Sequence, residues 1–428
     1  MIATILPGKL SGKVKVPASK SAAHRMFIAA ALSNTQCGMQ IEGVNRDIEA
    51  TVACLEALGA VIDRPSSNDD QGFTAVQPIP GAPAFTRPLM ACLGYQVPVT
   101  VDFSRVIELD CGESGSTLRF LLPLACALGV KARFVGRGRL PERPNQVLTD
   151  VLRAHGATID SDLLPMNVSG HLEPGAYSLP GNISSQYITG LLFALPLLDG
   201  DSEIILTTKL ESAAYVDMTL QALRRFHIHV EPTERGWRVP GNQVYRPEGY
   251  HSAVVEGDWS AAAFWLAANR MGSDIQVTGL SEDTAQGDRA VTLLLGRPLI
   301  DASGVPDLVP ALAVAAASLP QRTVITGAAR LRLKESDRLA ATADLINALG
   351  GRAEATEDGL VIDGGQPLHG GRVDGRNDHR IVMAAAIAAT VADGPVTVAD
   401  AEAVAKSYPD FFKHFNALGG HAHVEPLG

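Results

Sequence analysis

Two cations, two hydroxyl groups and an imidazole lie close together in the segment PASKSAAHR, residues 17–25. The segment follows an expected short strand at 13–16 and precedes an apolar run at 26–32. A helix N-terminus exposes unpaired N–H groups and a partial positive charge, so a helix that begins here favours an anion. Lys20 and Arg25 would then suit a doubly charged ligand such as a phosphate ester. A capped surface helix with solvated cations is an equally acceptable interpretation of this segment alone.

A second charged group lies in the sequence KESDR, residues 334–338. Lys334 and Arg338 are four residues apart, so on a helix they would share a face. Like charges at this spacing repel each other by roughly 0.2–0.5 kcal/mol unless an anion lies between them. Glu335 is a possible proton donor beside that face. The alternative is a solvated helix start in which Glu335 pairs with Arg338.

Small polar residues and arginines also occur at three other expected helix starts or loops. The turn GESGSTLR contains Gly115, and its backbone N–H groups could hold an anion or simply cap a helix. The loop GRLPERP places Arg139 and a second arginine beside two prolines, which suits bidentate binding of a carboxylate or phosphate, or a basic surface loop. Ser184, Ser185 and Gln186 offer neutral hydrogen bonds, although helix capping is the stronger interpretation of this segment alone.

Three further residues precede expected apolar helices near the C-terminus. Arg380 follows Asn377-Asp378-His379, and Lys406 lies in the segment 405–410. Asp307 is a lone carboxylate before an apolar run, where an N-cap role is the simpler interpretation. If the repeated units fold alike, these helix starts point the same way and could converge on one cleft between two domains. Burying so many unpaired cations would cost several kcal/mol each, so the pattern favours anionic ligands.

The elements that must position these residues recur six times along the chain. In each copy a helical pattern ends on a short apolar motif, with Gly just beyond the helix in all but the third, and passes into a strand. The copies lie at 55–62, 152–159, 223–230, 293–300, 346–353 and 415–422. Between them lie apolar, Ala-rich runs that we expect to be buried helices, at 22–32, 117–128, 188–198, 260–268, 308–318 and 381–391. The pattern predicts an α/β chain of six similar units in compact domains of about three units each. Residues 64–105 are expected to be a surface insertion, and 240–250 a domain boundary.

Composition limits the kinds of partner that the chain can have. Its 428 residues carry a net charge of −10, with 46% hydrophobic and 5% aromatic residues. The overall electrostatic field therefore does not attract nucleic acid or an acidic membrane. The five cysteines form no metal-binding spacing, which favours buried free thiols in a reducing compartment. We find no signal peptide, and the longest apolar stretch, 381–392, is too short to span a bilayer. A cytoplasmic location is therefore expected.

Together these motifs resemble the 5-enolpyruvylshikimate-3-phosphate (EPSP) synthase family over nearly the whole chain. The matching segments, in order, are PASKSAAHR, GESGSTLR, GRLPERP, SSQYITGLL, ESAAYVDMTL, VEGDWSAA, QGD, VPD, LKESDR, NDHR and AKSYPDFF. The resemblance implies a two-domain inside-out α/β barrel in which each domain is built from three βαβαββ-like units. It implies one lobe formed by residues 1–19 and 256–428, a second formed by 20–255, and hinges near 17–20 and 250–257.

The resemblance also implies the reaction and the residues that perform it. The enolpyruvyl group of phosphoenolpyruvate would pass to the 5-hydroxyl of shikimate 3-phosphate, with release of phosphate. Asp307 would accept the hydroxyl proton, Glu335 would protonate the methylene carbon, and Lys334 and Lys20 would assist. Shikimate 3-phosphate would contact Lys20, Ser21, Arg25, Ser184, Ser185, Gln186, Ser212, Tyr215, Asp307 and Lys334. Phosphoenolpyruvate would contact Lys20, Gly115, Arg139, Gln186, Arg338, Arg380 and Lys406. No metal or organic cofactor and no nucleic acid or membrane partner is expected, and we expect a monomer.

The chain departs from the family pattern at four places, one of which is the segment 64–105, longer than usual in the family. Glu113 stands where the family usually has Asn, and Arg330 where it often has Asn. Only a short stretch separates Asp288 from Asp307, where the family has another strand pair, so we expect a truncated fifth unit.

Two other functions stay open at this point. The related UDP-N-acetylglucosamine enolpyruvyl transferases share the fold and the donor, but they place a reactive Cys on a mobile loop, and GRLPERP contains none. A non-catalytic phosphate-ester-binding protein would fit a truncated unit, but the combination of Asp307, Glu335, Lys334 and Lys406 argues against it.

Overall fold

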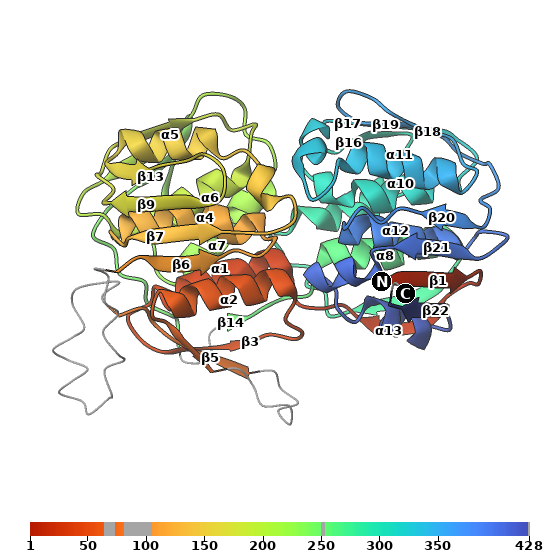
Figure 1. Ribbon diagram of the computed structural model, residues 1–428, viewed down its shortest axis with the longest axis horizontal. Coiled ribbons are helices and arrows are strands. Elements are labelled where there is room, and N and C mark those ends of the chain that lie inside the picture. Colours follow the sequence, from red (N-terminus) through yellow and green to blue (C-terminus); the bar gives the residue numbers. More distant parts are fainter. Residues whose placement is uncertain (64–72, 81–104, 250–252, 427–428) are drawn as a thin grey trace. The chain divides into compact units, whose positions relative to one another are not determined.

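A computed structural model describes residues 1–63, 73–80, 105–249 and 253–426. The chain divides into two compact units (Figure 1). Met1–Ser19 and Glu256–Gly428 form one, here called the terminal unit, and Lys20–Val255 form the other, the central unit. Both mix helices with strands, as expected of an α/β fold. Throughout the described residues, no helix is both long and apolar enough to cross a membrane.

One arrangement of strands and helices recurs in both units. Two parallel strands are joined by a buried helix, an amphipathic helix follows, and two antiparallel strands complete a sheet in which the last strand lies next to the second. One set in the central unit consists of β6 (Ile107–Asp110), α4 (Gly115–Ala127), β7 (Ala132–Val135), the 3₁₀ turn η1 (Leu140–Glu142), α5 (Gln146–Ala154), β8 (Ala157–Ile159) and β9 (Met166–Gly170). Its strand order is β6-β7-β9-β8.

The central unit contains two more such sets. One comprises β10 (Ala176–Leu179), α6 (Ser185–Ala194), η2 (Leu195–Leu197), β11 (Ser202–Leu206), α7 (Ala213–Arg225), β12 (Glu231–Thr233) and β13 (Gly236–Val239). The other comprises α1 (Lys20–Ala31), β3 (Cys37–Gln40), α2 (Arg46–Ala57), β4 (Val61–Asp63), β5 (Phe73–Gln77) and β14 (Ala253–Val254). Their strand orders are β10-β11-β13-β12 and β14-β3-β5-β4.

The terminal unit contains two complete sets. One comprises β16 (Leu299–Asp301), η4 (Pro306–Leu308), α10 (Val309–Ala317), β17 (Arg322–Thr326), η5 (Ala329–Leu333), α11 (Arg338–Ala348), β18 (Ala353–Ala355) and β19 (Leu360–Asp363). The other comprises β20 (Gly371–Val373), α12 (His379–Ala389), β21 (Val396–Ala399), η6 (Ala401–Lys406), α13 (Phe411–Ala417) and β22 (His421–Glu425), with β1 (Ile2–Leu6) inserted between β21 and β22.

The remaining set of the terminal unit is short. It comprises β2 (Ser11–Lys15), α8 (Trp259–Arg270), β15 (Asp274–Thr278), η3 (Gly287–Ala290) and α9 (Val291–Leu294), and its sheet has only two strands, β15 and β2. The expectation of a truncated fifth unit is therefore wrong in position. The fifth unit, which carries Asp307, has the complete sheet β16-β17-β19-β18. The fourth is short because only residues 295–298 separate α9 from β16, which leaves no room for a strand pair.

The chain passes between the units at two points that lie side by side. β2 pairs with β15 in the terminal unit and then leads into α1, while β14 pairs with β3 in the central unit and then leads into α8. Ser19 N donates to Glu256 O at 2.7 Å, and Asp258 N donates to Pro17 O at 2.9 Å. At each passage, the last strand before the crossing is therefore hydrogen-bonded within the unit that the chain is leaving.

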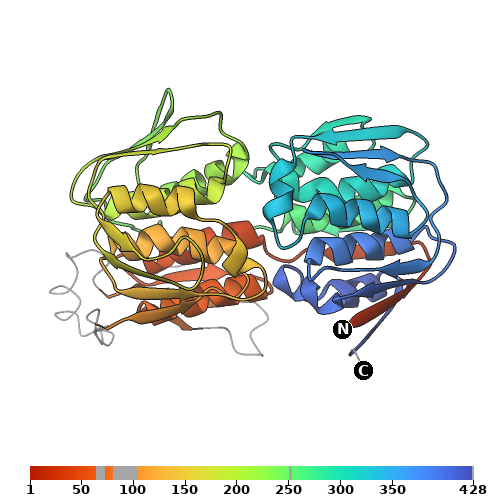
Figure 2. The ribbon, with the colours of Figure 1, turned by 45° about the horizontal axis from the view of Figure 1, so that its top comes forward.

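The expected buried helices form the core of each unit. In the terminal unit α8, α10 and α12 contact one another (Figure 2), and all nine residues of α10 are buried. Alanine predominates in these helices and lets them approach closely. Four of the five cysteines, Cys37, Cys54, Cys111 and Cys126, are buried free thiols, as expected, and Cys92 lies outside the described residues.

The repeated helix ends behave as the sequence predicts. Gly59, Gly156, Gly350 and Gly419 all have positive φ just after a helix, between 82° and 103°. The third copy lacks the glycine, and there His227 adopts φ 55° instead. The turn geometry is thus kept even where a side chain makes it less favourable.

Candidate active site

Arg25 is the most deeply held cation of the central unit. Its guanidinium donates to Thr219 Oγ1 at 2.9 Å, to Tyr215 O at 2.8 Å and to Ser21 O at 2.6 Å, and it lies 5.1 Å from the centre of the Phe120 ring. Burial lowers the pKa of Arg25 to about 9, which leaves it charged at neutral pH. Because these acceptors are uncharged, the positive charge of Arg25 can still stabilise an anion.

The first residue of α1 is Lys20, and its ammonium group lies 2.9 Å from Asp47 Oδ2. Its side chain is only 15% exposed. One turn later, His24 Nδ1 lies 2.7 Å from Thr51 Oγ1, which in turn lies 2.6 Å from Thr117 Oγ1. These buried contacts join the starts of α1, α2 and α4 and fix the position of Lys20 relative to the other two helices.

Gln186 is held between α4 and the start of α6. It accepts a hydrogen bond from Arg119 Nη1 at 2.8 Å and donates to Ser116 Oγ at 2.9 Å. The two helices can approach closely because Gly190 lies against the other helix, where a Cβ would be 2.3 Å from Arg119 O. Ser184 caps α6 by accepting from Gln186 N at 3.3 Å, so the capping interpretation holds for this residue.

Gly115 and the two loop arginines lie differently from one another. Gly115 begins α4, and a Cβ on it would lie 2.6 Å from Arg143 Nη1, so a guanidinium packs directly against its backbone. This buried arginine is Arg143, a residue that the sequence left without a role. Arg139 is 45% exposed, and its Nε lies 4.0 Å from Glu142 Oε2.

The last two predicted residues of the central unit lie at the start of α7. Ser212 is buried and has a left-handed backbone, with φ 53°, and its side chain does not cap the helix. The carbonyl of Tyr215 accepts the hydrogen bond from Arg25 described above. A left-handed non-glycine residue costs about 1 kcal/mol or more and is frequent at ligand sites.

In the terminal unit, three cations surround one carboxylate. Asp307 Oδ1 lies 3.0 Å from Arg338 Nη1 and 3.8 Å from Lys334 Nζ, and Oδ2 lies 3.0 Å from Arg380 Nη2. Burial alone would raise the pKa of Asp307, but the charges of Arg380, Lys334 and Arg338 outweigh it and hold the pKa far below the ordinary range. The N-cap interpretation is wrong, because Asp307 precedes Leu308, the N-cap of α10, and its side chain turns to the cations instead.

Arg338 connects three carboxylates. Besides Asp307 it binds Asp378 Oδ2 through Nε at 2.7 Å and Glu335 through Nη2. Its own pKa is lowered by burial, but the charges of Asp378, Glu335 and Asp307 outweigh this and raise it above the ordinary value. The guanidinium is 2% exposed, so this is a buried ion network and not a solvated surface pair.

The expectation that Lys334 and Arg338 share a helix face is wrong. Asp337 accepts a hydrogen bond from Ala340 N at 3.1 Å and caps α11, which therefore begins only at Arg338. Lys334 lies before the helix, at the end of η5. The two cations still meet, because both approach Asp307.

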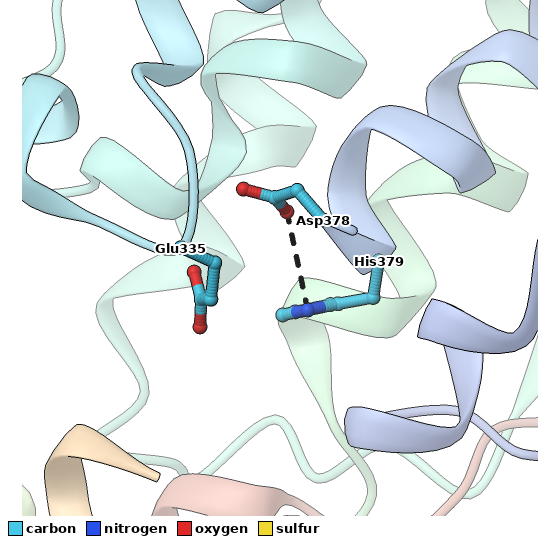
Figure 3. A group of neighbouring side chains, drawn as sticks. All are labelled: Glu335, Asp378 and His379. Carbon is cyan, nitrogen blue, oxygen red and sulfur yellow. Dashed lines mark ion pairs between the residues drawn. The ribbon is translucent and has the colours of Figure 1, made fainter. Parts of the chain in front are cut away.

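Glu335, Asp378 and His379 form the only group of potential metal ligands found within the described residues (Figure 3). His379 Nδ1 lies 4.0 Å from Asp378 Oδ1. Both carboxylates already bind Arg338, which occupies the place that a cation would take. The group therefore belongs to the ion network of Asp307.

Arg380 and Lys406 flank the same network. Arg380, the second residue of α12, also donates from Nη1 to Asp307 O at 2.9 Å. Lys406 is buried and donates to Asn377 O at 2.6 Å. Asn377 has φ 48°, and this left-handed turn directs its carbonyl to the lysine.

The structure also reveals site residues whose roles could not be assigned from the sequence. Ser260 and Asp288 lie beside Arg380: Ser260 Oγ accepts from Arg380 Nη2 at 3.3 Å and bonds to Asp288 Oδ2. Both residues lie in motifs that the sequence shows, VEGDWSAA and QGD, but the motifs did not indicate the roles of these two residues. Of the two unusual residues, Glu113 lies over Gly138, where a Cβ would be 2.4 Å from Glu113 Oε2, and Arg330 Nη2 donates to Ser303 O at 2.8 Å.

Comparison with known proteins gives one consistent family. The profile described as EPSP synthase (3-phosphoshikimate 1-carboxyvinyltransferase) matches residues 6–80, 96–299 and 298–415. The chain is 38% identical to the 3-phosphoshikimate 1-carboxyvinyltransferase of Clostridium botulinum (strain Alaska E43 / Type E3) over 99% of both chains, and 39% identical to that of Clostridioides difficile (strain 630) over 97% of both. Its fold matches a solved EPSP synthase from Acinetobacter baumannii with a TM-score of 0.77 at 24% identity, covering 99% of this chain and 100% of that one.

Proposed function

Because the chain belongs to the EPSP synthase family, we propose that its two half-sites perform that family's reaction. The enolpyruvyl group of phosphoenolpyruvate is transferred to the 5-hydroxyl of shikimate 3-phosphate, and phosphate is released. The observation that carries this assignment is Asp307, a carboxylate beside Lys334, Arg338 and Arg380, with a possible acid, Glu335, on the same arginine.

The fold assignment goes further than the α/β class. Each unit is one lobe of an inside-out α/β barrel, in which buried helices form the centre and sheets the outside. The lobes are residues 1–19 with 256–428, and 20–255. The hinges are the passages near 17–20 and 250–257, of which 250–252 lie outside the described residues. Closing the lobes would bring the two half-sites to one cleft and exclude water.

The half-sites divide the two substrates between them. Shikimate 3-phosphate binds mainly in the central unit, to Lys20, Ser21, Arg25, Ser184, Ser185, Gln186, Ser212 and Tyr215, with Asp307 and Lys334 from the other lobe. Phosphoenolpyruvate binds Lys20, Gly115, Arg139 and Gln186 from one lobe and Arg338, Arg380 and Lys406 from the other. The buried, uncharged surroundings of Arg25 support its assignment to the phosphate of the acceptor.

The reaction needs one acid and one base in a dry, cation-lined site. Glu335 protonates the methylene carbon of phosphoenolpyruvate, and positive charge develops at C2. The 5-hydroxyl attacks C2 while Asp307 takes its proton, which gives a tetrahedral intermediate. Elimination of phosphate, together with one proton of the new methyl group, restores the carbon–carbon double bond and completes the transfer. No step calls on a metal or an organic cofactor.

Substrate binding itself would activate Asp307 as a base. A carboxylate held by three cations has too low a pKa to remove a proton from a hydroxyl group. The carboxylate and phosphate of phosphoenolpyruvate compete for Arg338 and Arg380, which weakens their hold on Asp307. Its pKa then rises when the hydroxyl is in place.

The test is phosphate release on mixing the protein with shikimate 3-phosphate and phosphoenolpyruvate. The wild-type protein and the surface control Asp393→Asn should release phosphate, whereas Asp307→Ala and Lys20→Ala should each abolish release. Unchanged turnover in either variant removes that residue from the mechanism.

The family match supports this reaction over the two alternatives. Turnover with UDP-N-acetylglucosamine, or binding of shikimate 3-phosphate without turnover, would favour one of them. A monomeric state and a cytoplasmic location remain predictions.

A further inference from the structure

One buried acid of the terminal unit has no part in the mechanism above. Asp288 is 6% exposed and lies in η3. Its Oδ2 bonds to Ser260 Oγ, and its Oδ1 finds no hydrogen-bond partner among the residues that the structure describes. A buried carboxyl oxygen without a partner favours the protonated acid over the carboxylate.

The segment around Asp288 is fixed to the start of α8. The side chain of Gln286 accepts from Trp259 N at 3.1 Å and donates to Gly257 O at 2.9 Å. Thr284 Oγ1 accepts from Gln286 N at 3.0 Å and donates to Glu256 at 2.7 Å. These hydrogen bonds hold the segment of Asp288 against the start of α8, where Ser260 lies.

The direction of the bond between Asp288 and Ser260 decides what Ser260 can do. Arg380 is only a donor, so Ser260 Oγ accepts from Arg380 Nη2 at 3.3 Å. If Asp288 carries a proton, it also donates to Ser260, and the hydroxyl proton of Ser260 is left for a ligand. If Asp288 is ionised, Ser260 must donate to Asp288 instead.

We propose that Asp288 is a positioning residue: as a carboxylic acid it donates to Ser260, which then donates its own proton to the anion held by Arg380. This inference rests on the proposed function, in which Arg380 binds phosphoenolpyruvate. It adds Ser260 to the binding residues and Asp288 behind it. Neither has a place among the roles that the family resemblance implied.

The electrostatic surroundings agree with this geometry. Burial, together with the charge of Asp307, raises the pKa of Asp288 to about 7, although Arg380 and the bond to Ser260 lower it. Asp258, the N-cap of α8, also raises the pKa. As pH rises above this value, Asp288 becomes negatively charged, like Asp307, near the bound anion. The hydroxyl proton of Ser260 then points to Asp288 and not to the ligand. Affinity for phosphoenolpyruvate should then fall.

The test compares Asp288→Asn, Asp288→Ala and Ser260→Ala with wild type, from pH 6 to pH 9. Asn keeps the donor to Ser260 and cannot ionise. The KM for phosphoenolpyruvate should rise more steeply with pH in the wild type than in Asp288→Asn. Ser260→Ala and Asp288→Ala should raise it about tenfold at pH 6, the loss expected of one hydrogen bond to a charged group, with the KM for shikimate 3-phosphate nearly unchanged. Titration of the substrate's own phosphate is common to all variants, and Asp393→Asn controls for loss of a surface charge.

The opposite results would overturn the proposal. These are an unchanged KM in Ser260→Ala, or the same pH dependence in Asp288→Asn as in the wild type. If Asp288→Ala does not fold, Asp288→Asn and Ser260→Ala decide the question, since each changes only one polar group. If the wild-type protein releases no phosphate, the proposed reaction is wrong. Calorimetric binding of phosphoenolpyruvate at pH 6 and pH 8 then decides the role of Asp288, because the wild-type affinity should fall more steeply than that of Asp288→Asn.

Discussion

The central and terminal units stabilise their buried arginines in different ways. Arg25 in the central unit donates to hydroxyl and carbonyl oxygens, which carry no charge. Arg338 in the terminal unit is held by three carboxylates, Asp307, Glu335 and Asp378. The first arrangement keeps its net positive charge and is ready to receive an anion. In the proposed mechanism the second exchanges its own carboxylates for those of a ligand, and this exchange would free Glu335 to act as the acid and Asp307 as the base.

Lys20 departs from this rule within the central unit. Lys20 pairs with Asp47 at 2.9 Å, so this cation too has a carboxylate to give up. Lys20 is also the residue that we assign to both substrates. Ion pairs thus occur at the residues assigned to the reacting groups, and uncharged partners at the residue assigned to the phosphate that only anchors the acceptor.

Glu335→Gln tests the acid side of this comparison and should have the largest effect. Gln keeps a hydrogen bond to Arg338 but cannot donate a proton to carbon. We expect kcat to fall by about 10²–10⁴-fold, the usual contribution of a general acid, with KM for phosphoenolpyruvate nearly unchanged. Steady-state phosphate release measures both constants, and Glu354→Gln, at an exposed position of β18, is the control. A fall confined to KM would make Glu335 a binding residue and leave the proton donor unidentified.

A pair of acids within the terminal unit should respond to pH in opposite directions. The lowered pKa of Asp307 stabilises the fold above the unfolded-state pKa, near 4, and this stability is lost as pH falls below it. The pKa of Asp288, raised to about 7, instead makes the fold less stable as pH rises from about 4 to 7. Asp288→Asn should remove that decline, which we expect to be roughly 2–4 kcal/mol in the free energy of unfolding. Urea unfolding at intervals from pH 4 to pH 8 measures it, and equal slopes in both proteins would mean that Asp288 is ionised throughout.

Arg25→Lys tests the cation whose hydrogen-bond partners are all uncharged in the contacts described above. A lysine cannot make the three directed contacts of the guanidinium, so KM for shikimate 3-phosphate should rise about 30-fold. The KM for phosphoenolpyruvate should change little. The control is Arg224→Lys, an exposed position on α7. A larger change in KM for phosphoenolpyruvate than for shikimate 3-phosphate would reverse the assignment of the two substrates.

Local rules predicted much of the fold from the sequence. The glycines that follow the amphipathic helices have the left-handed backbone that C-terminal helix turns require, and the apolar runs are the buried helices. The truncation was also visible as a missing stretch before Asp307. Its assignment to the fifth unit was wrong because β2, from the far N-terminal end, completes the short sheet of the fourth. Pairing between distant strands leaves no local signal.

The site was predictable where its residues stand in one motif, and less so where two segments meet. The ion pair between Glu335 and Arg338 was foreseen as an alternative, but no local pattern indicated that Asp337 caps α11, so that Lys334 lies before the helix. The contact between Ser260 and Asp288 joins residues that are 28 positions apart, and the side chain of Gln286 binds the backbone of Trp259 beside it. Such contacts depend on tertiary packing, which residue spacing does not encode.

The smallest expected effect is that of Arg139→Gln. It compares two arginines of one loop, of which one is half exposed and the other buried. Arg139 is 45% exposed, whereas Arg143 packs against the backbone of Gly115. If Arg139 serves phosphoenolpyruvate only when the lobes close, its loss should raise the KM for phosphoenolpyruvate about tenfold. It should change the free energy of unfolding by no more than about 0.5 kcal/mol. Arg143→Gln is the matched variant and should destabilise the protein more, since it removes a packed, buried cation. Kinetics and urea unfolding of both variants separate the two roles. Equal destabilisation by the two substitutions would mean that Arg139 supports the loop and does not wait for a ligand.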